Sequence, residues 1–106
     1  MKSLLFGSPG IPMSTQPRDT LNGIKQVRAL GLDAMEFEFV QSVHVSEKLA
    51  PELNKLAKDL NVVLTCHGQY FVNLAAVEKA KYDASIARML AAAKRVAECG
   101  GYSVTW

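Results

Sequence analysis

The segment from residue 33 to residue 39 constrains the fold most, because its side chains alternate strictly in kind. One face would carry Met35, Phe37 and Phe39, and the other Ala34, Glu36 and Glu38. A period of two is typical of a β-strand. In an open sheet covered by helices on both faces, two carboxylates on one face would be buried at a high cost. In a (β/α)8 barrel they would point into the lumen, near the active-site mouth. The pattern favours the barrel, and an interior salt bridge or a solvated strand end is the alternative.

Apolar runs and amphipathic segments alternate along the whole chain. We predict strands at 3–7, 33–39, 62–66 and 102–106, and helices at about 17–30, 46–60 and 77–99. Leu30 would close the apolar stripe of the first helix, Ser46 would cap the second, and the third would bury an apolar face that includes Tyr82, Leu90 and Val96. This alternation with short connections is typical of βαβ crossovers and a parallel sheet. A full (β/α)8 barrel takes about 250 residues. The prediction is therefore an α/β fold, a partial (β/α)8 TIM barrel with four parallel strands and three helices. Residues 1–106 would form the N-terminal portion of one barrel domain, and a small open flavodoxin-like domain is the alternative.

The third and fourth strands strengthen the barrel prediction. If His67 points inward, Val63 and Thr65 do so too, and Ser103 and Thr105 would share that face in the last strand. The outward faces would carry mainly large apolar side chains, among them Leu64, Cys66, Tyr102, Val104 and Trp106. Small or polar side chains inside and large apolar ones outside favour a barrel over an open sheet.

His67 is the strongest single candidate for a catalytic or metal-binding residue, because it directly follows a buried strand at the edge where barrel enzymes place their active sites. A neutral imidazole there can bind zinc, manganese or iron, but catalytic zinc usually has three protein ligands. A structural, hydrogen-bonding histidine is the alternative. His44, in a polar loop, is expected to be solvated. The aromatic pair Tyr70 and Phe71 could stack on a base or a sugar, or Phe71 could pack over the barrel top with Leu74.

The net charge and the cysteine content exclude few classes of function. The net charge of +2, without a block of basic residues, does not by itself indicate a nucleic-acid partner. Cys66 and Cys99 lack zinc-finger spacing and are expected to be buried free thiols in a reducing compartment. The apolar run at residues 1–7 is too short for a signal peptide or a membrane span, so we expect a cytoplasmic protein without a membrane partner.

Three runs of the sequence resemble a known family of enzymes. They are Gly-Ser-Pro-Gly-Ile-Pro at 7–12, Gly-Leu-Asp-Ala-Met-Glu-Phe-Glu-Phe-Val at 31–40 and His-Gly-Gln-Tyr-Phe-Val-Asn-Leu at 67–74. Together they resemble endonuclease IV homologues, the apurinic/apyrimidinic endonucleases of the xylose-isomerase-like barrel superfamily, and most of all their archaeal-type branch. The similarity covers essentially the whole chain, and the second and third runs are its most specific parts.

The resemblance implies a TIM barrel that binds divalent metals, typically zinc, with manganese or magnesium as further possibilities. It also implies cleavage of DNA 5′ to an abasic site by a metal-activated hydroxide. His67 corresponds to the first histidine ligand of the family, and Tyr70 and Asn73 match its H-x-x-Y-x-x-N loop near bound DNA. Glu36 matches a second-strand glutamate of the sugar-isomerase relatives, and we take Glu36 and Glu38 as catalytic candidates.

Two departures and two alternatives accompany this resemblance. Gly68 and Gln69 stand where the family often has a small residue and proline, and the next histidine ligand would follow a residue like Trp106. We therefore expect an N-terminal fragment of a metal-dependent hydrolase that is inactive alone.

The first alternative is a sugar or sugar-acid isomerase or epimerase, in which Glu36 or Glu38 serves as base or metal ligand. The second is a half-barrel that self-associates through its open sheet edges.

Overall fold

The computed structural model describes residues 3–106, so residues 1 and 2 of the N-terminal apolar run lie outside the described part. Strands and helices alternate in the predicted order. The strands are β1 (Gly7–Pro9), β2 (Ala34–Glu38), β3 (Val63–His67) and β4 (Ser103–Thr105), and the helices are α1 (Thr20–Ala29), α2 (Ala50–Leu60) and α3 (Lys79–Glu98). No helix in the part of the chain that is described is both long and apolar enough to cross a membrane.

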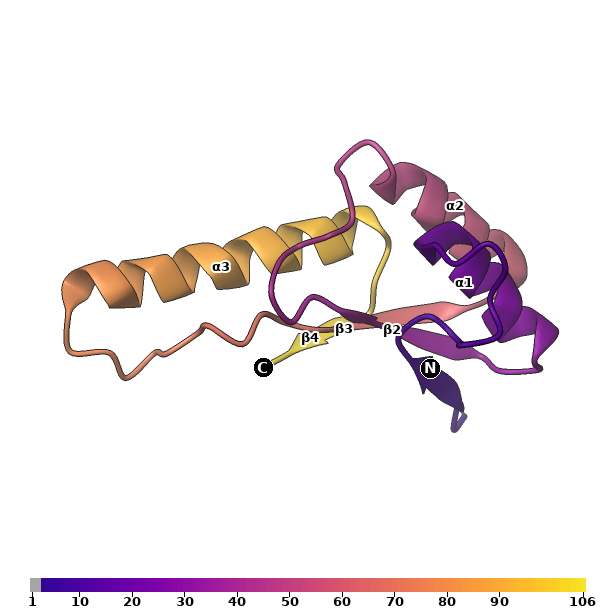
Figure 1. Ribbon diagram of the computed structural model, residues 1–106, viewed down its shortest axis with the longest axis horizontal. Helices are drawn as coiled ribbons and strands as arrows, with labels where there is room; N and C mark the ends of the chain where they lie inside the picture. The colour runs from indigo at the N-terminus through magenta and orange to yellow at the C-terminus, as the bar shows by residue number, and fades with distance from the viewer. Residues whose placement is uncertain (1–2) are drawn as a thin grey trace.

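The four strands form one parallel sheet in the order β1-β2-β3-β4. All three helices lie on the same side of this sheet, and within residues 3–106 its other side carries no helix (Figure 1). Such an arrangement is that of part of a barrel, in which the helix-free side would face the lumen. The predicted four-stranded, three-helix α/β architecture is therefore confirmed.

The core lies between the sheet and its helices. Fully buried side chains from β2 and β3 meet those of α1 and α2: Met35, Phe37, Leu64, Cys66, Ile24, Val27 and Leu53. Phe37 stacks on Phe39, with ring centroids 5.5 Å apart. Burial of each large apolar side chain stabilises the fold by about 1.5–3 kcal/mol, which explains why one face of each central strand is uniformly apolar.

Local signals explain where α1 and α2 begin and end. The Asp19 side chain accepts a hydrogen bond from the Asn22 amide, 2.8 Å away, and caps the start of α1. Gly31, at φ 79°, lets the chain turn out of the same helix. The expectation that Ser46 caps α2 was wrong by one turn. Its hydroxyl accepts from the Leu49 amide at 3.1 Å, but this closes a turn that precedes the helix.

The apolar face of α3 is shifted from the predicted one. Tyr82 and Leu90 were expected to be buried but are 41% and 66% exposed. Val96 is buried, as expected, and the other buried side chains of this helix are Ser85 and Ala92. The first half of α3 extends past the end of the sheet (Figure 1), so the side chains of that half meet few core partners. Leu30, expected on the apolar stripe of α1, is exposed as well.

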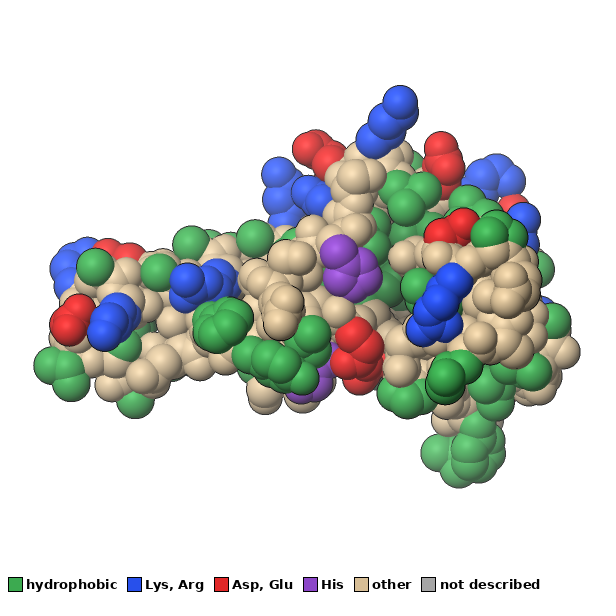
Figure 2. Space-filling view, viewed as in Figure 1, with side chains coloured by type: hydrophobic (Ala, Val, Ile, Leu, Met, Phe, Trp, Pro, Cys, Tyr) green, Lys and Arg blue, Asp and Glu red, His purple; other side chains and the backbone are tan. Residues whose placement is uncertain are grey.

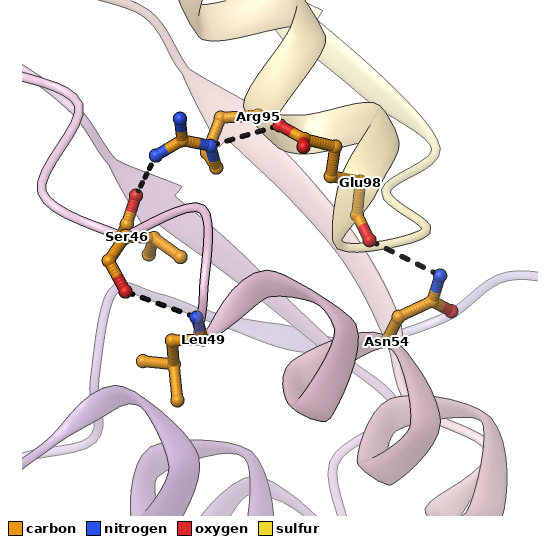
Figure 3. A network of polar contacts seen from close by, with 6 residues as sticks. Ser46, Leu49, Asn54, Arg95 and Glu98 are labelled. Atoms are coloured by element: carbon orange, nitrogen blue, oxygen red, sulfur yellow. Dashed lines mark hydrogen bonds and ion pairs between the residues drawn. The ribbon is translucent and has the colours of Figure 1, made fainter.

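A polar network joins α3 to α2 and to the loop between β2 and α2 (Figure 3). The Arg95 guanidinium donates from Nη1 to the carbonyl of Val45 and from Nε to Glu98 Oε1, the latter at 3.0 Å. Asn54 Nδ2 donates to the Glu98 carbonyl at 3.3 Å. The C-terminal end of α3 thereby anchors the β2–α2 loop, which borders the strand ends.

Candidate functional site at the strand ends

The carboxyl ends of β2 and β3 bring the predicted site residues side by side. Glu36 is paired in register with Thr65, and Glu38 with His67. His67 in turn is paired with Thr105 of β4. These side chains are half-buried or exposed on the helix-free face, whereas their neighbours along β2 and β3 are buried against the helices. The assignment of side chains to the two faces therefore agrees with the barrel pattern.

Glu38 lies in surroundings that favour its protonated form. Partial burial raises the pKa of Glu38 above its ordinary value, and the neighbouring Glu36 carboxylate raises it further, while His67 opposes the shift. Like charges in one site favour the neutral form of one partner. A carboxyl group with a raised pKa retains its proton to higher pH and is suited to exchanging it with a ligand.

A cavity of about 260 Å³ lies between these carboxylates and the β1–α1 loop. Its lining includes Pro9, Gly10, Ile11, Arg18, Glu36, Glu38 and His44. Gly10, at φ 98°, lies so close to Glu38 that a Cβ there would be 3.3 Å from Glu38 Cγ. The Arg18 guanidinium donates to the carbonyls of Pro12 (2.9 Å) and Ile11 (3.2 Å), and so fixes the loop that forms this wall.

His67 is oriented by the backbone. Its Nδ1 lies 2.8 Å from the carbonyl oxygen of Gly68, and because a carbonyl only accepts, Nδ1 must donate. The proton is then on Nδ1 and the lone pair on Nε2. The ring meets that of Tyr70 edge-on, with centroids 5.9 Å apart. The absence of a side chain at Gly68 makes room for the indole ring of Trp106, which a Cβ there would overlap and displace.

The loop after His67 presents its aromatic side chains to solvent. Tyr70 and Phe71 are exposed, and so is Leu74, so the alternative in which Phe71 and Leu74 pack over the top is not seen. The loop is nevertheless held, because Arg88 Nη1 donates to the Phe71 carbonyl at 2.8 Å. The same loop and α3 enclose a groove of about 530 Å³. Its lining includes Tyr70, Phe71, Asn73, Lys81, Ser85 and Arg88.

The structure brings Glu36, Glu38 and His67 together, links Tyr70 to them through the ring of His67, and leaves Asn73 farther along the loop. The Asn73 side chain accepts from the Ala75 amide at 3.0 Å, so part of its hydrogen-bonding capacity serves the loop itself.

Within residues 3–106, no group of three His, Cys, Asp or Glu side chains could hold a metal ion. Cys66 and Cys99 are buried free thiols, as expected, and burial raises the pKa of Cys66 to about 12.

His44 is the site residue that the sequence did not reveal. It is exposed, as expected, but its ring is held, because Nε2 lies 2.9 Å from the Glu38 carbonyl oxygen. The ring also meets Phe39 edge-on, with centroids 5.0 Å apart. No periodic pattern could have indicated this contact, since it joins a loop side chain to a strand backbone.

Comparison with known proteins agrees with this geometry. The sequence profile of the family described as "Xylose isomerase-like TIM barrel" matches residues 24–106. The chain belongs to this family. An uncharacterized protein of Methanocaldococcus jannaschii is 35% identical over 97 residues, which are 92% of this chain and 34% of that protein. The chain thus spans about a third of the length of this curated relative.

Among solved structures, D-psicose 3-epimerase, crystallised in the presence of D-fructose, has a similar fold. The TM-score is 0.73 at 20% sequence identity, and the match covers 94% of this chain and 36% of that one. At this identity the likeness shows the fold alone. The family match over residues 24–106 confirms the xylose-isomerase-like barrel predicted from the sequence, at the level of the superfamily.

Proposed function

We propose that this chain forms part of a metal-dependent phosphodiesterase of the endonuclease IV type, acting on abasic sites in DNA. The observation that carries the proposal is the contact between His67 and the exposed aromatic loop. Tyr70 contacts the imidazole edge-on, and Phe71 follows it at the surface. Aromatic side chains beside a DNA backbone can stack on bases, each worth roughly 1–3 kcal/mol. This arrangement suits a polymer with unstacked bases better than a small sugar.

The charges around the loop support the same proposal. Lys81 and Arg88 line the groove that also contains Tyr70 and Phe71. Cationic side chains next to exposed aromatic rings are suited to a nucleic-acid strand, because they neutralise phosphates while the rings take the bases. Glu78 also lines this groove and lies 3.7 Å from Lys81, so Arg88 is, among residues 3–106, its uncompensated cation. The carboxylates of Glu36 and Glu38 line a separate cavity beside the β1–α1 loop.

The donor set at the strand ends fits part of a divalent metal site. His67 would offer Nε2, and Glu38, its partner in the register, would offer a carboxylate oxygen; imidazole nitrogen and carboxylate oxygen are ligands that zinc accepts. Zinc, or manganese or magnesium in its place, would supply a Lewis acid and an activated water. Within residues 3–106, no three His, Cys, Asp or Glu side chains are placed so that they could hold a metal ion together, so we expect weak zinc binding and no incision by this chain alone.

Binding of abasic DNA tests the proposal directly. Fluorescence anisotropy with a labelled duplex should show tighter binding to a duplex with one abasic site than to the intact duplex. Tyr70→Ala should weaken this binding by roughly 5- to 160-fold, the equivalent of one stacking contact. Tyr102→Ala is the matched control, because Tyr102 is 63% exposed and Tyr70 64%. Equal affinities for both duplexes, or equal effects of the two substitutions, would refute the proposal.

The second candidate is a sugar or sugar-acid isomerase or epimerase, with a small sugar as substrate. The observation that favours it is the carboxylate pair facing a cavity of about 260 Å³, in which the raised pKa of Glu38 suits a proton-transferring group. The solved structure with a similar fold is itself a sugar epimerase. Saturable binding of D-fructose together with no preference for abasic DNA would favour this candidate.

A further inference from the structure

His44 has two properties that an ordinary solvated loop histidine lacks. Its ring is fixed by the Glu38 carbonyl at one edge and by the ring of Phe39, which is fully buried. The next residue, Val45, is buried and accepts a hydrogen bond from Arg95 through its carbonyl. The exposed imidazole is therefore held in place from both sides, at the cost of the freedom that an exposed side chain normally keeps.

The contact with Glu38 also fixes the tautomer of the neutral ring. A backbone carbonyl can only accept, so Nε2 must carry the proton and donate it, at 2.9 Å. The lone pair then resides on Nδ1, which makes no hydrogen bond to another residue in the part of the chain that the structure describes, 3–106. An imidazole with one nitrogen fixed by the backbone and the other free is prepared to accept a hydrogen bond from a ligand.

The same imidazole lines the cavity that contains both carboxylates. Glu36 and Glu38 of β2, Arg18 and the β1–α1 loop, and His44 of the β2–α2 loop all line this cavity. In Figure 2 acidic and histidine side chains gather at the middle of the visible face, where the surface is hollowed. A ligand that enters the cavity to reach the carboxylates would pass within the range of the His44 ring.

We propose that His44 is a ligand-contacting residue of this cavity, and that its Nδ1 accepts a hydrogen bond from a sugar hydroxyl group. The inference rests on the proposed function and extends it to the sugar moiety of the substrate. Carboxylates repel a phosphate but accept hydrogen bonds from hydroxyl groups. The Arg18 guanidinium, which lines the same cavity, already donates to the carbonyls of Pro12 and Ile11. The cavity lining therefore matches a neutral hydroxylated ring, whether it is the hemiacetal of an abasic site in DNA or a free monosaccharide.

The first measurement is the tautomer itself. Long-range proton–nitrogen correlation spectra of histidine-labelled protein should show His44 with its proton on Nε2. Because the chain has only two histidines, a His67→Gln variant assigns the signals. A proton on Nδ1, or the averaged signal of a freely exchanging imidazole, would overturn the inference whatever the ligand proves to be.

The second measurement compares two abasic duplexes. A natural abasic site, made by removing uracil, carries a C1 hydroxyl group, and its tetrahydrofuran analogue does not. The unsubstituted protein should bind the natural site roughly 2- to 12-fold more tightly, the worth of one neutral hydrogen bond. His44→Phe keeps an aromatic edge for Phe39 but removes both nitrogens, and should abolish this preference. His44→Asn places an amide oxygen near the Nδ1 position and should retain part of it.

The outcomes separate this inference from the proposed function. Two outcomes would overturn the role of His44 alone. In one, His44→Phe keeps the preference for the natural site. In the other, the unsubstituted protein recognises abasic DNA but shows no such preference. If the protein does not distinguish abasic from intact DNA, the proposed function fails, and D-fructose is then the probe. If the protein binds fructose and His44→Phe does not, the hydroxyl group that His44 contacts belongs to a free sugar, and the inference is supported. If the protein does not bind fructose, the inference is overturned as well.

Discussion

Arg95 offers the most informative single perturbation, because it connects the stability of the fold to the geometry of the site. Its guanidinium donates to the Val45 carbonyl and to Glu98, and the ion pair is well shielded, with side chains 21% and 28% exposed (Figure 3). Arg95→Met keeps most of the hydrocarbon stem and removes every donor. Val45 is buried, so its carbonyl would lose this partner where water has little access.

The loss in free energy of unfolding caused by Arg95→Met can be estimated from these two contacts. A hydrogen bond from a charged donor to a buried carbonyl is worth about 1.5–3 kcal/mol. A partly exposed ion pair adds about 0–1 kcal/mol. Arg95→Met should therefore lower the free energy of unfolding by about 1.5–4 kcal/mol, a large fraction of the roughly 5–15 kcal/mol of an ordinary domain.

Urea denaturation followed by circular dichroism measures this difference. Arg88→Met is the matched control, because Arg88 also donates from Nη1 to a backbone carbonyl, that of Phe71, but in an exposed setting. It should cost about 0.5 kcal/mol, as surface substitutions usually do. Equal losses for the two variants would refute the reasoning that burial makes the Arg95 contact strong. We also expect the His44 tautomer signal to average in Arg95→Met, since the β2–α2 loop loses its anchor.

Three further substitutions test the site and the packing. Glu36→Gln should lower the pKa of Glu38 towards its ordinary value, as read from carboxyl carbon shifts. The pKa of Glu38 is higher in the folded protein than in the unfolded chain, so the free energy of unfolding falls as the pH rises from the unfolded-state pKa through the folded-state pKa. The variant should therefore lose less stability over this pH range than the unsubstituted protein. Gly7→Ala would place a Cβ 2.5 Å from the Ala34 carbonyl oxygen and should cost about 1–3 kcal/mol in urea denaturation. Leu53→Ala, at a fully buried position, should cost about 2–5 kcal/mol in the same assay, and a loss below 1 kcal/mol would contradict the core described above.

The central strands were predictable because two constraints coincide there. A period of two and a fully apolar outer face located β2 and β3 to within one residue at each end. The first strand was placed at 3–7, but pairing with β2 begins only at Gly7. An apolar run shows which residues avoid water, whereas a strand also needs a partner, and Leu4 and Phe6 remain exposed. The partner of a strand is a tertiary property that the run itself does not encode.

The candidate site was predictable only where it depends on strand periodicity. Glu36, Glu38 and His67 could be placed on one face because each position follows from the alternation along its own strand. His44 could not, because its place is fixed by a loop conformation and by a hydrogen bond to the backbone of Glu38, six residues away. Loops carry many functional groups for the same reason that they resist prediction: the scaffold, and not a repeat in the sequence, positions them.

The two sides of the site favour different ligands, and this difference decides between the functions. The carboxylates of Glu36 and Glu38 and the imidazole of His44 line a small cavity suited to sugar hydroxyl groups. Tyr70 and Arg88 line an open groove suited to a nucleic-acid strand. A free sugar would need only the first, whereas an abasic nucleotide would use both, its ring in the cavity and its flanking strand in the groove. If so, Tyr70→Ala and His44→Phe should each weaken binding of abasic DNA, while only His44→Phe should weaken binding of a monosaccharide.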